Sequence, residues 1–287
     1  MSLRPVPVCL ALCAALLLGT AACMPPQWGA NAILHPYRRP VTRTPSHAYD
    51  NLYFAGDGLV LKGWRVRTYM PRRGVIIYLH GIGDNRQSSL GLVSRFVPKG
   101  YDVIAYDSRG HGTSQGDTCT YGVYERRDLK SVIDSLREEH VILFGVSLGA
   151  AVALQEAADD PRVIGVVSVA TFSDLRTVAR DRAPFFASEG NIRDAFTLAE
   201  AQGKFRVDDA SPIVAAPRIR VPVLLFHGAA DTDTKPAHSQ RVHDALGGPK
   251  KLALVPRAEH NDVLNHEWVW DAISDWLDQV VMAPATP

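Results

Sequence analysis

Short apolar runs alternate with amphipathic stretches from about residue 49 onward. The run at 74–81 is apolar without interruption, which is typical of a strand buried on both faces of a sheet. Residues 59–67 instead alternate apolar and polar side chains, as an antiparallel strand with one face in water does. Further apolar runs, each of which predicts a central strand, stand at 101–107, 141–146, 163–170, 221–228 and 251–256. We therefore expect a sheet that begins mixed and becomes parallel.

Helical periods separate most of these predicted strands. Leu129, Val132, Ile133 and Leu136 recur at the spacing of one helix face, and residues 269–280 carry a second stripe of this kind. Strands that alternate with helices predict a doubly wound α/β fold, whose functional site lies at the carboxyl ends of the strands.

The interval from 171 to 220 breaks the alternation, because it contains no strong strand pattern. A structureless loop of this length is uncommon in a compact domain. Two amphipathic stretches on either side of Pro184 predict short helices, and we interpret the interval as a cap inserted over the strand ends. Its aromatic residues could either line a substrate cleft or anchor the cap to the core; they are Phe172, Phe185, Phe186 and Phe196.

Residues 1–22 have the pattern of a secretory signal peptide: one early cation, an apolar run and small residues at its end. The run is shorter than the ~20 residues that a membrane-spanning helix needs, so we expect export with cleavage. Ala21, Ala22 and Cys23 also resemble a bacterial lipobox, although Thr20 stands where that motif usually has leucine. We expect a cell-envelope lipoprotein anchored in the membrane by a lipid on Cys23. The alternative is cleavage near Ala22 and release into the periplasm or the medium.

A proline-rich segment, residues 23–48, separates the signal peptide from the domain. It shows no apolar period, and we interpret it as an extended tether. One domain is expected to follow at 49–287, with the cap insertion at 171–220 inside it.

The composition narrows the classes of function. At 287 residues and 46% hydrophobic residues, the chain can bury a full core in one domain of α/β size. Lys and Arg number 31 against 30 Asp and Glu, and no run of like charge could follow a phosphate backbone. We therefore expect no nucleic-acid partner. Cys119 is the only cysteine of the domain, so no internal disulfide framework is expected.

One serine lies where a predicted strand passes into a predicted helix. Ser147 stands between Gly145 and Gly149 in the stretch FGVSLGAA. This is the G-x-S-x-G pattern of a nucleophile elbow, in which a sharp turn lifts the hydroxyl above the sheet and the glycines leave room for it. The pattern alone also occurs in ordinary strand-to-helix connections, but its place after a buried strand favours a nucleophile.

A serine hydroxyl needs a base, and the base needs an acid to orient it. His260 follows the predicted strand at 251–256 and Asp231 follows the one at 221–228, so that the chain order is serine, acid, histidine. Asp233 is the second candidate for the acid. The histidines at 227, 238, 243 and 266 lie at unsuitable places for the base, and we expect them to be structural or on the surface.

Two backbone N–H groups are candidates for an oxyanion hole. They belong to Leu148, directly after the serine, and to Ile82 in the glycine-containing loop LHGIGDN. Asp107, Arg109 and His111, in the next glycine-containing loop, are expected to brace the architecture. We expect no metal site, because His80 and His111 are not at ligand spacing with cysteines or carboxylates.

The motifs LHGIGDN, YDSRGHGTS, GVSLGA, HGAADTDTKP and AEHND together resemble the α/β-hydrolase superfamily over roughly residues 50–280. The short cap is similar to that of bacterial esterases, monoacylglycerol lipases, acyl-protein thioesterases and serine aminopeptidases. The resemblance implies a mostly parallel sheet of about eight strands with helices on both faces. It also implies a catalytic triad of Ser147, Asp231 and His260, with Ile82 and Leu148 as oxyanion donors.

The leading hypothesis is a serine hydrolase of carboxylesterase type that cleaves a small acyl ester or thioester through an acyl-enzyme and needs no cofactor. A serine aminopeptidase is the alternative enzyme, in which Asp174, Asp181 or Glu189 of the cap would hold the substrate ammonium. A non-catalytic envelope lipoprotein that binds a lipid or partner is the alternative outside enzymes. A missing triad residue would favour that last hypothesis, and none is missing.

Overall fold

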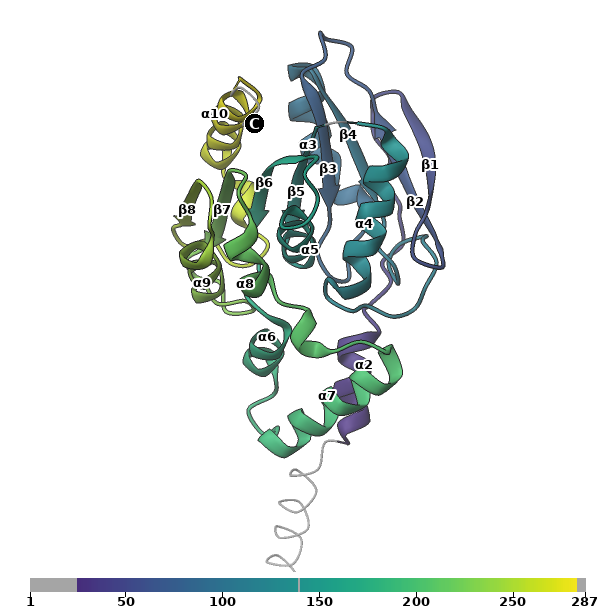
Figure 1. Ribbon diagram of the computed structural model, residues 1–287, viewed down its shortest axis with the longest axis vertical. Coiled ribbons are helices and arrows are strands. Elements are labelled where there is room, and N and C mark those ends of the chain that lie inside the picture. Colours follow the sequence, from purple (N-terminus) through teal and green to yellow (C-terminus); the bar gives the residue numbers. More distant parts are fainter. Residues whose placement is uncertain (1–24, 139, 283–287) are drawn as a thin grey trace, which may run out of the picture.

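The computed structural model of the chain describes residues 25–138 and 140–282. Within these residues, eight strands form one sheet in the order β1-β2-β4-β3-β5-β6-β7-β8 (Figure 1). Their bounds are β1 (Tyr49–Ala55), β2 (Val60–Val66), β3 (Gly74–Leu79), β4 (Tyr101–Tyr106), β5 (Val141–Val146), β6 (Val163–Val169), β7 (Val223–Gly228) and β8 (Lys250–Val255). Strand β2 pairs antiparallel with β1 and β4, and the other neighbours are parallel. The expected α/β fold with a mixed, mostly parallel sheet is confirmed.

Helices cover both faces of this sheet. The α-helices are α2 (Pro26–Leu34), α3 (Leu90–Phe96), α4 (Val123–Leu136), α5 (Leu148–Ala157), α6 (Leu175–Arg182), α7 (Glu189–Gly203), α8 (Pro212–Ala215), α9 (Ala237–Ala245) and α10 (Glu267–Met282). Short 3-10 turns are η1 (Arg86–Ser89), η2 (Val97–Lys99), η3 (Val207–Asp209), η4 (Ala216–Arg218) and η5 (Val263–Asn265). Side chains of α3 and α10 join one buried cluster, and those of α4, α5 and α9 join another.

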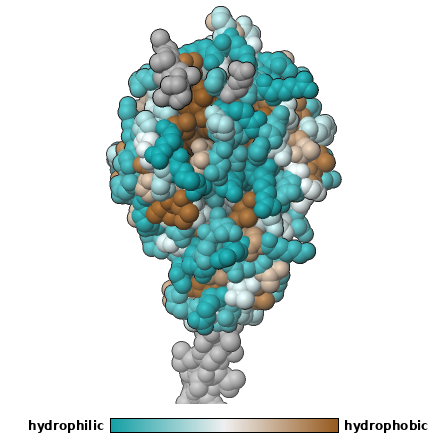
Figure 2. Space-filling view, in the orientation of Figure 1, coloured by the Kyte–Doolittle hydropathy of each residue, from teal (hydrophilic) through white to brown (hydrophobic). Residues whose placement is uncertain are grey.

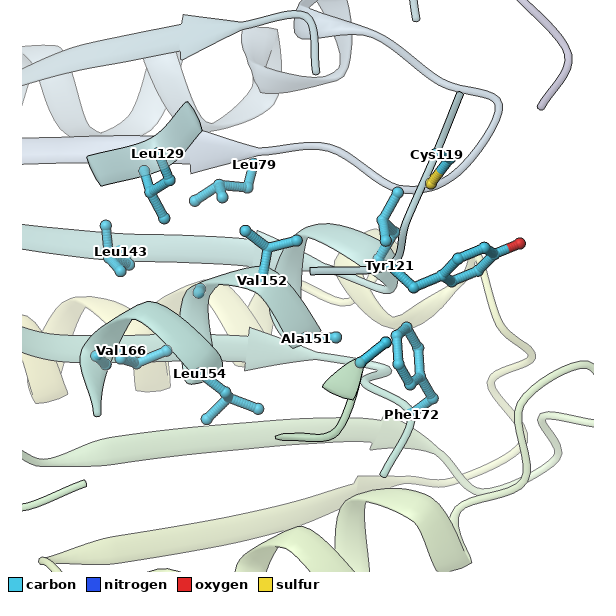
Figure 3. Close-up of a cluster of buried hydrophobic side chains, with 14 of the residues drawn as sticks. Leu79, Cys119, Tyr121, Leu129, Leu143, Ala151, Val152, Leu154, Val166 and Phe172 are labelled. Carbon is cyan, nitrogen blue, oxygen red and sulfur yellow. The ribbon is translucent and has the colours of Figure 1, made fainter. Parts of the chain in front are cut away.

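The two buried clusters follow from the alternation of side chains along each strand. In β3, Ile77 and Leu79 belong to the cluster with α4 and α5, whereas Ile76 and Tyr78 belong to the cluster with α3 and α10. Figure 3 shows part of the first cluster, where leucine and valine side chains of the sheet meet those of the helices. Because both faces are covered, a central strand is mostly apolar, which is the pattern that the sequence shows at 74–81.

Both edges of the sheet differ from the sequence prediction. The apolar run at 251–256 predicts a central strand, but β8 pairs with β7 alone and leaves Leu254 47% exposed. Strand β1 has no counterpart in the prediction, because its residues are mostly exposed or half-buried and form no apolar run. An edge strand has neighbours on one side only, so apolar content does not identify it reliably.

Helix α2 corrects the prediction that residues 23–48 form an extended tether. Pro26 occupies the first helical position, where its missing N–H costs no hydrogen bond. Ile33 and Leu34 are buried, and a Cβ on Gly29 would come within 2.7 Å of Ala195 Cβ in α7. The helix therefore forms because it packs on α7, and Figure 1 shows α2, α6 and α7 together beyond one end of the sheet. Residues 35–48 form neither helix nor strand.

The predicted signal peptide at 1–22 and Cys23 lie outside the described residues. Among the helices that are described, none combines the length and the apolar character needed to cross a membrane.

The aromatic residues of the interval 171–220 divide into two pairs. Phe172 and Phe196 are buried in the core cluster with α4 and α5 and therefore anchor this interval, and Phe196 also borders a cavity. Phe185 is 100% exposed and Phe186 is also exposed, so neither lines a cleft. The face seen in Figure 2 is mostly hydrophilic, with several separate hydrophobic patches.

Candidate active site

Ser147 lies on a strained turn between β5 and α5. Its φ of 51° and ψ of −112° are unusual for a residue with a side chain. A Cβ on Gly145 would overlap Ala150, and a Cβ on Gly149 would overlap the carbonyl oxygen of Leu79. The two glycines are therefore needed because backbone passes directly beside the turn, as the sequence pattern predicts for a nucleophile elbow.

His260 connects Ser147 to Asp231. The His260 Nδ1 atom lies 2.7 Å from Asp231 Oδ2, and its Nε2 atom lies 3.0 Å from Ser147 Oγ. Because an ionised carboxylate only accepts hydrogen bonds, Nδ1 carries the ring hydrogen and Nε2 accepts from the serine hydroxyl. The structure thus brings together three residues that lie far apart in the sequence, in the geometry of a nucleophile, a base and an orienting acid.

Asp231 is buried and accepts four hydrogen bonds. Its Oδ2 atom accepts from His260 Nδ1 and from His227 Nε2 at 3.1 Å, and its Oδ1 atom accepts from the backbone N–H groups of Asp233 and Thr234. Burial by itself raises the pKa of this carboxyl, but the hydrogen bonds from the two histidines and from Thr234 outweigh burial and lower the pKa. Asp231 therefore stays ionised, as an acid that orients a histidine must.

His227 is a part of this site that the sequence analysis missed. It is fully buried, and its Nε2–H points at the Asp231 carboxylate and at the carbonyl oxygen of Thr234, 2.7 Å away. Its Nδ1 atom accepts from the Ser239 hydroxyl at 2.6 Å. His227 thus holds Asp231 Oδ2, the oxygen that also accepts from His260. Its place at the carboxyl end of β7, four residues before Asp231, is the signal that could have revealed it.

Asp233, the second candidate for the acid, makes no hydrogen bond to His260 among the described residues. Its side chain is exposed, and its carbonyl oxygen accepts from Arg182 Nε at 3.0 Å. The geometry therefore places Asp231, rather than Asp233, behind the histidine.

The two backbone N–H groups expected to form an oxyanion hole are close to the serine in the fold. Leu148 is the first residue of α5, so its N–H lies at the positive end of the helix dipole. Ile82 follows Gly81, and a Cβ added to Gly81 would lie 3.5 Å from Ser147 Cβ. No hydrogen bond within residues 25–138 and 140–282 uses either N–H. Both groups are therefore free to bind an oxygen that approaches Ser147.

The loop residues expected to brace the architecture are buried and paired. Asp107 accepts from the side chain of Arg86 and from its backbone N–H, and Arg109 forms an ion pair of 2.7 Å with Asp128. The ring of His111 packs edge-on against that of His80. The described residues contain no group of three or more His, Cys, Asp or Glu side chains that could hold a metal ion.

A cavity of about 950 Å³ opens over Ser147 and His260. Its wall is rich in polar and charged residues, which include Arg39, Asp84, Asp233, Asn261 and Asn265. A cavity of this size accommodates a small-molecule ligand.

The carboxylates considered for an aminopeptidase are already engaged. Asp174 caps α6 by accepting from the N–H of Thr177, and Glu189 pairs with Arg180. Asp181 lines the cavity, but it forms an ion pair of 2.8 Å with Lys235.

Comparisons with known proteins agree with the fold. A family model described as serine aminopeptidase, S33, matches residues 70–193. The chain is 31% identical over 216 residues to the uncharacterized protein YqkD of Bacillus subtilis, and the alignment covers 71% of this chain and 70% of YqkD. It is 27% identical over 252 residues to the uncharacterized protein YfhR of Escherichia coli O157:H7, and the alignment covers 84% of this chain and 83% of YfhR.

A solved structure of similar fold is the Pyrococcus furiosus esterase Pf2001. It superimposes with a TM-score of 0.71 at 22% identity, over 86% of this chain and 99% of the esterase. The fold, the family model and these relatives show that the chain belongs to the α/β-hydrolase superfamily. Membership in this group supports a hydrolytic activity.

Proposed function

We propose that the protein is a serine hydrolase that cleaves carboxylic esters or thioesters through an acyl-enzyme. The observation that carries the proposal is the hydrogen-bonded series from Ser147 Oγ to His260 to Asp231, 3.0 Å and 2.7 Å long, at the wall of a 950 Å³ cavity.

The first half of the reaction acylates Ser147. His260 Nε2 takes the hydroxyl proton as Ser147 Oγ attacks the substrate carbonyl carbon, and Asp231 stabilises the imidazolium that forms. The carbonyl oxygen becomes an oxyanion, which accepts hydrogen bonds from the N–H groups of Ile82 and Leu148. The imidazolium then gives its proton to the departing alcohol or thiol, and the acyl group stays on the serine.

Water completes the cycle. His260 takes a proton from a water molecule that attacks the acyl carbon, and the same two N–H groups hold the second oxyanion. Ser147 recovers the proton from the histidine as the carboxylic acid leaves. No step requires a cofactor.

A serine aminopeptidase is the second candidate, favoured by the family model that matches residues 70–193. It would need a free carboxylate to hold the substrate ammonium. Of the three cap carboxylates considered for this role, Asp181 alone lines the cavity, and Lys235 balances its charge. Ester cleavage is therefore the stronger proposal. A panel of p-nitrophenyl esters and aminoacyl p-nitroanilides tests the choice: we expect turnover of the esters, and turnover of the anilides alone would contradict ester cleavage.

We also propose that the enzyme is a lipoprotein of the bacterial cell envelope, because small residues precede Cys23 in a lipobox-like motif. Expressed in a bacterium, the protein should partition with membranes and carry the mass of a diacylglyceryl cysteine, and Cys23→Ser should abolish both properties. Unmodified wild-type protein in the soluble periplasm would contradict the anchor.

A further inference from the structure

A second cavity, of about 500 Å³, lies between the N-terminal helix α2 and helices α6 and α7. We call it the apolar pocket. Its wall is built largely from hydrocarbon side chains, which include those of Trp28, Ile33, Ala179, Ile192 and Phe196. Figure 1 shows the three helices that enclose it at one end of the molecule.

The apolar pocket adjoins the catalytic cavity. Ile82 and Arg182 line both spaces. Arg182 is held by hydrogen bonds to the carbonyl oxygen of Asp233, at 3.0 Å, and to the hydroxyl of Thr234, at 2.7 Å. The two cavities therefore meet at Ile82 and Arg182, beside Ser147.

The two spaces differ in chemistry. The wall around Ser147 mixes charged and amide side chains with apolar ones, whereas Arg182 and Asn191 are the only charged and amide residues among the described residues that line the apolar pocket. An ester has two halves, and the acyl half is a hydrocarbon chain that gains free energy when it leaves water. We propose that the apolar pocket binds the acyl chain of the substrate, and that α2 is one wall of the substrate site. This inference rests on the proposed ester cleavage.

The proposed position of the oxyanion determines the direction in which the acyl chain extends from Ser147. If the carbonyl oxygen of the substrate accepts from the N–H of Ile82, the carbonyl carbon lies beside Ile82, whose side chain borders the apolar pocket. The alcohol half then remains in the larger polar cavity, which is open to water. The floor beneath the acyl chain includes Tyr121, whose ring packs against Phe172 while its hydroxyl points away from the core (Figure 3).

Because the apolar pocket has a finite volume, we expect the enzyme to prefer acyl chains of a certain length. Each buried methylene raises kcat/KM roughly fourfold, the equivalent of about 0.8 kcal/mol, until the pocket is full. We therefore expect kcat/KM to rise from p-nitrophenyl acetate to esters of medium chain length and then to fall.

Variants from two opposite walls test this assignment. Ala32 on α2 and Ala179 on α6 both line the apolar pocket, and neither belongs to the proposed triad or oxyanion hole. Ala32→Phe and Ala179→Phe should each leave kcat/KM for the acetate ester within about twofold and lower it for the octanoate ester about tenfold, which equals the loss of about two buried methylenes. Asn31→Phe is the matched control, because it adds the same ring to an exposed position of α2 that does not line the pocket.

A third variant tests whether the apolar pocket binds an acyl chain or a polar group. Asn191 lines the apolar pocket, and its Nδ2 atom is buried without a hydrogen-bond partner among the described residues. Asn191→Leu removes this amide at similar volume, so kcat/KM for the octanoate ester should be unchanged or higher. A loss of about tenfold or more would show that the pocket holds a polar group, and would overturn the proposal.

The outcomes distinguish this inference from the proposed function. If neither pocket variant changes the chain-length profile while the wild type still hydrolyses esters and Ser147 still reacts with a fluorophosphonate, the acyl chain lies elsewhere and the inference is wrong. An equal loss on acetate and octanoate in a folded variant would also contradict it. If the wild type hydrolyses no ester and Ser147 does not react, the proposed function itself fails.

Discussion

Both carboxylate oxygens of Asp231 accept hydrogen bonds. Two histidines and two backbone N–H groups donate to it, and they lower the pKa of its carboxyl although it is buried. Because both of its oxygens are engaged, the carboxylate cannot turn away from His260. In the proposed mechanism it holds the histidine with the ring hydrogen on Nδ1, which leaves Nε2 ready to accept the serine proton.

The first prediction distinguishes the two candidate acids. Asp231→Asn should lower kcat by about 10³–10⁴-fold, because an amide can present a donor to Nδ1 and favour the wrong tautomer of His260. Asp233→Asn is the matched control, and its kcat should stay within about twofold because its side chain is exposed. Steady-state kinetics on a p-nitrophenyl ester give both values. The reverse ranking would transfer the role to Asp233.

For single residues, the sequence predicts which side chains meet where residue type and chain order coincide. Ser147, Asp231 and His260 each follow a predicted strand, and the fold brings the ends of those strands together. His227 was missed because a histidine inside an apolar run looks like part of a strand. Its contact with Asp231 depends on how the loop after β7 curves back, which no periodicity describes.

The strained turn at Ser147, which is the predicted nucleophile elbow, is tightly constrained by neighbouring backbone. Gly149 faces the backbone of β3, and a methyl group there would overlap the carbonyl oxygen of Leu79. The turn cannot move away from β3, because Ser147 must stay at the end of β5, which is hydrogen-bonded to β3.

The second prediction concerns this glycine. Gly149→Ala should lower the free energy of unfolding by about 1–3 kcal/mol, the usual cost of overpacking, and should reduce activity as well. Gly190→Ala in α7 is the control: a Cβ added there would lie 3.7 Å from Ser188 Oγ, an ordinary contact, so the change should be neutral or stabilise by up to about 1 kcal/mol. Urea unfolding measures both variants. A Gly149→Ala protein as stable as the wild type would show that the elbow is looser than described.

Elements at the margins of the domain were harder to predict than those at its centre. Strands β3 to β7 are buried on both faces and are therefore largely apolar. Helix α2 has only nine residues and begins beside two prolines, so its sequence indicates an irregular segment. It is helical because α7 offers it an apolar surface, and that surface is formed by residues more than a hundred positions away.

The whole molecule keeps several histidines uncharged in its interior, and this affects its stability. Burial lowers the pKa of His111 to about 3, helped by His80, and lowers the pKa of His238 to about 4, helped by Arg241. In the unfolded chain a histidine has a pKa of about 6.5. Between about pH 6.5 and pH 4 the unfolded chain therefore binds protons that the folded chain does not, so these two residues contribute stability at neutral pH that is lost as the pH falls.

Glu156 acts in the opposite sense, because burial raises the pKa of its carboxyl to about 7. The third prediction is therefore a net decrease of the free energy of unfolding between pH 7 and pH 5. His111, His238 and Glu156 together account for about 2 kcal/mol of it. Burial also lowers the pKa of His80, which adds to the decrease. Urea unfolding at a series of pH values measures it. His238→Gln should flatten the dependence and Glu156→Gln should steepen it. A stability that is constant or higher at pH 5 would contradict this assignment of neutral histidines.

The proposed function requires that Ser147 be a reactive nucleophile, and labelling with a fluorophosphonate measures that reactivity. The purified protein is treated with a fluorophosphonate, digested and analysed by mass spectrometry, in parallel with Ser147→Ala and with Ser168→Ala. Ser168 is fully buried in β6 and has no hydrogen-bond partner among the described residues, so its variant controls for loss of a serine hydroxyl. We predict one adduct, on Ser147, in the wild type and in Ser168→Ala, and none in Ser147→Ala with an unchanged circular dichroism spectrum. A wild-type protein that stays unlabelled at every pH at which it is folded, or an adduct that persists in Ser147→Ala, would contradict the account.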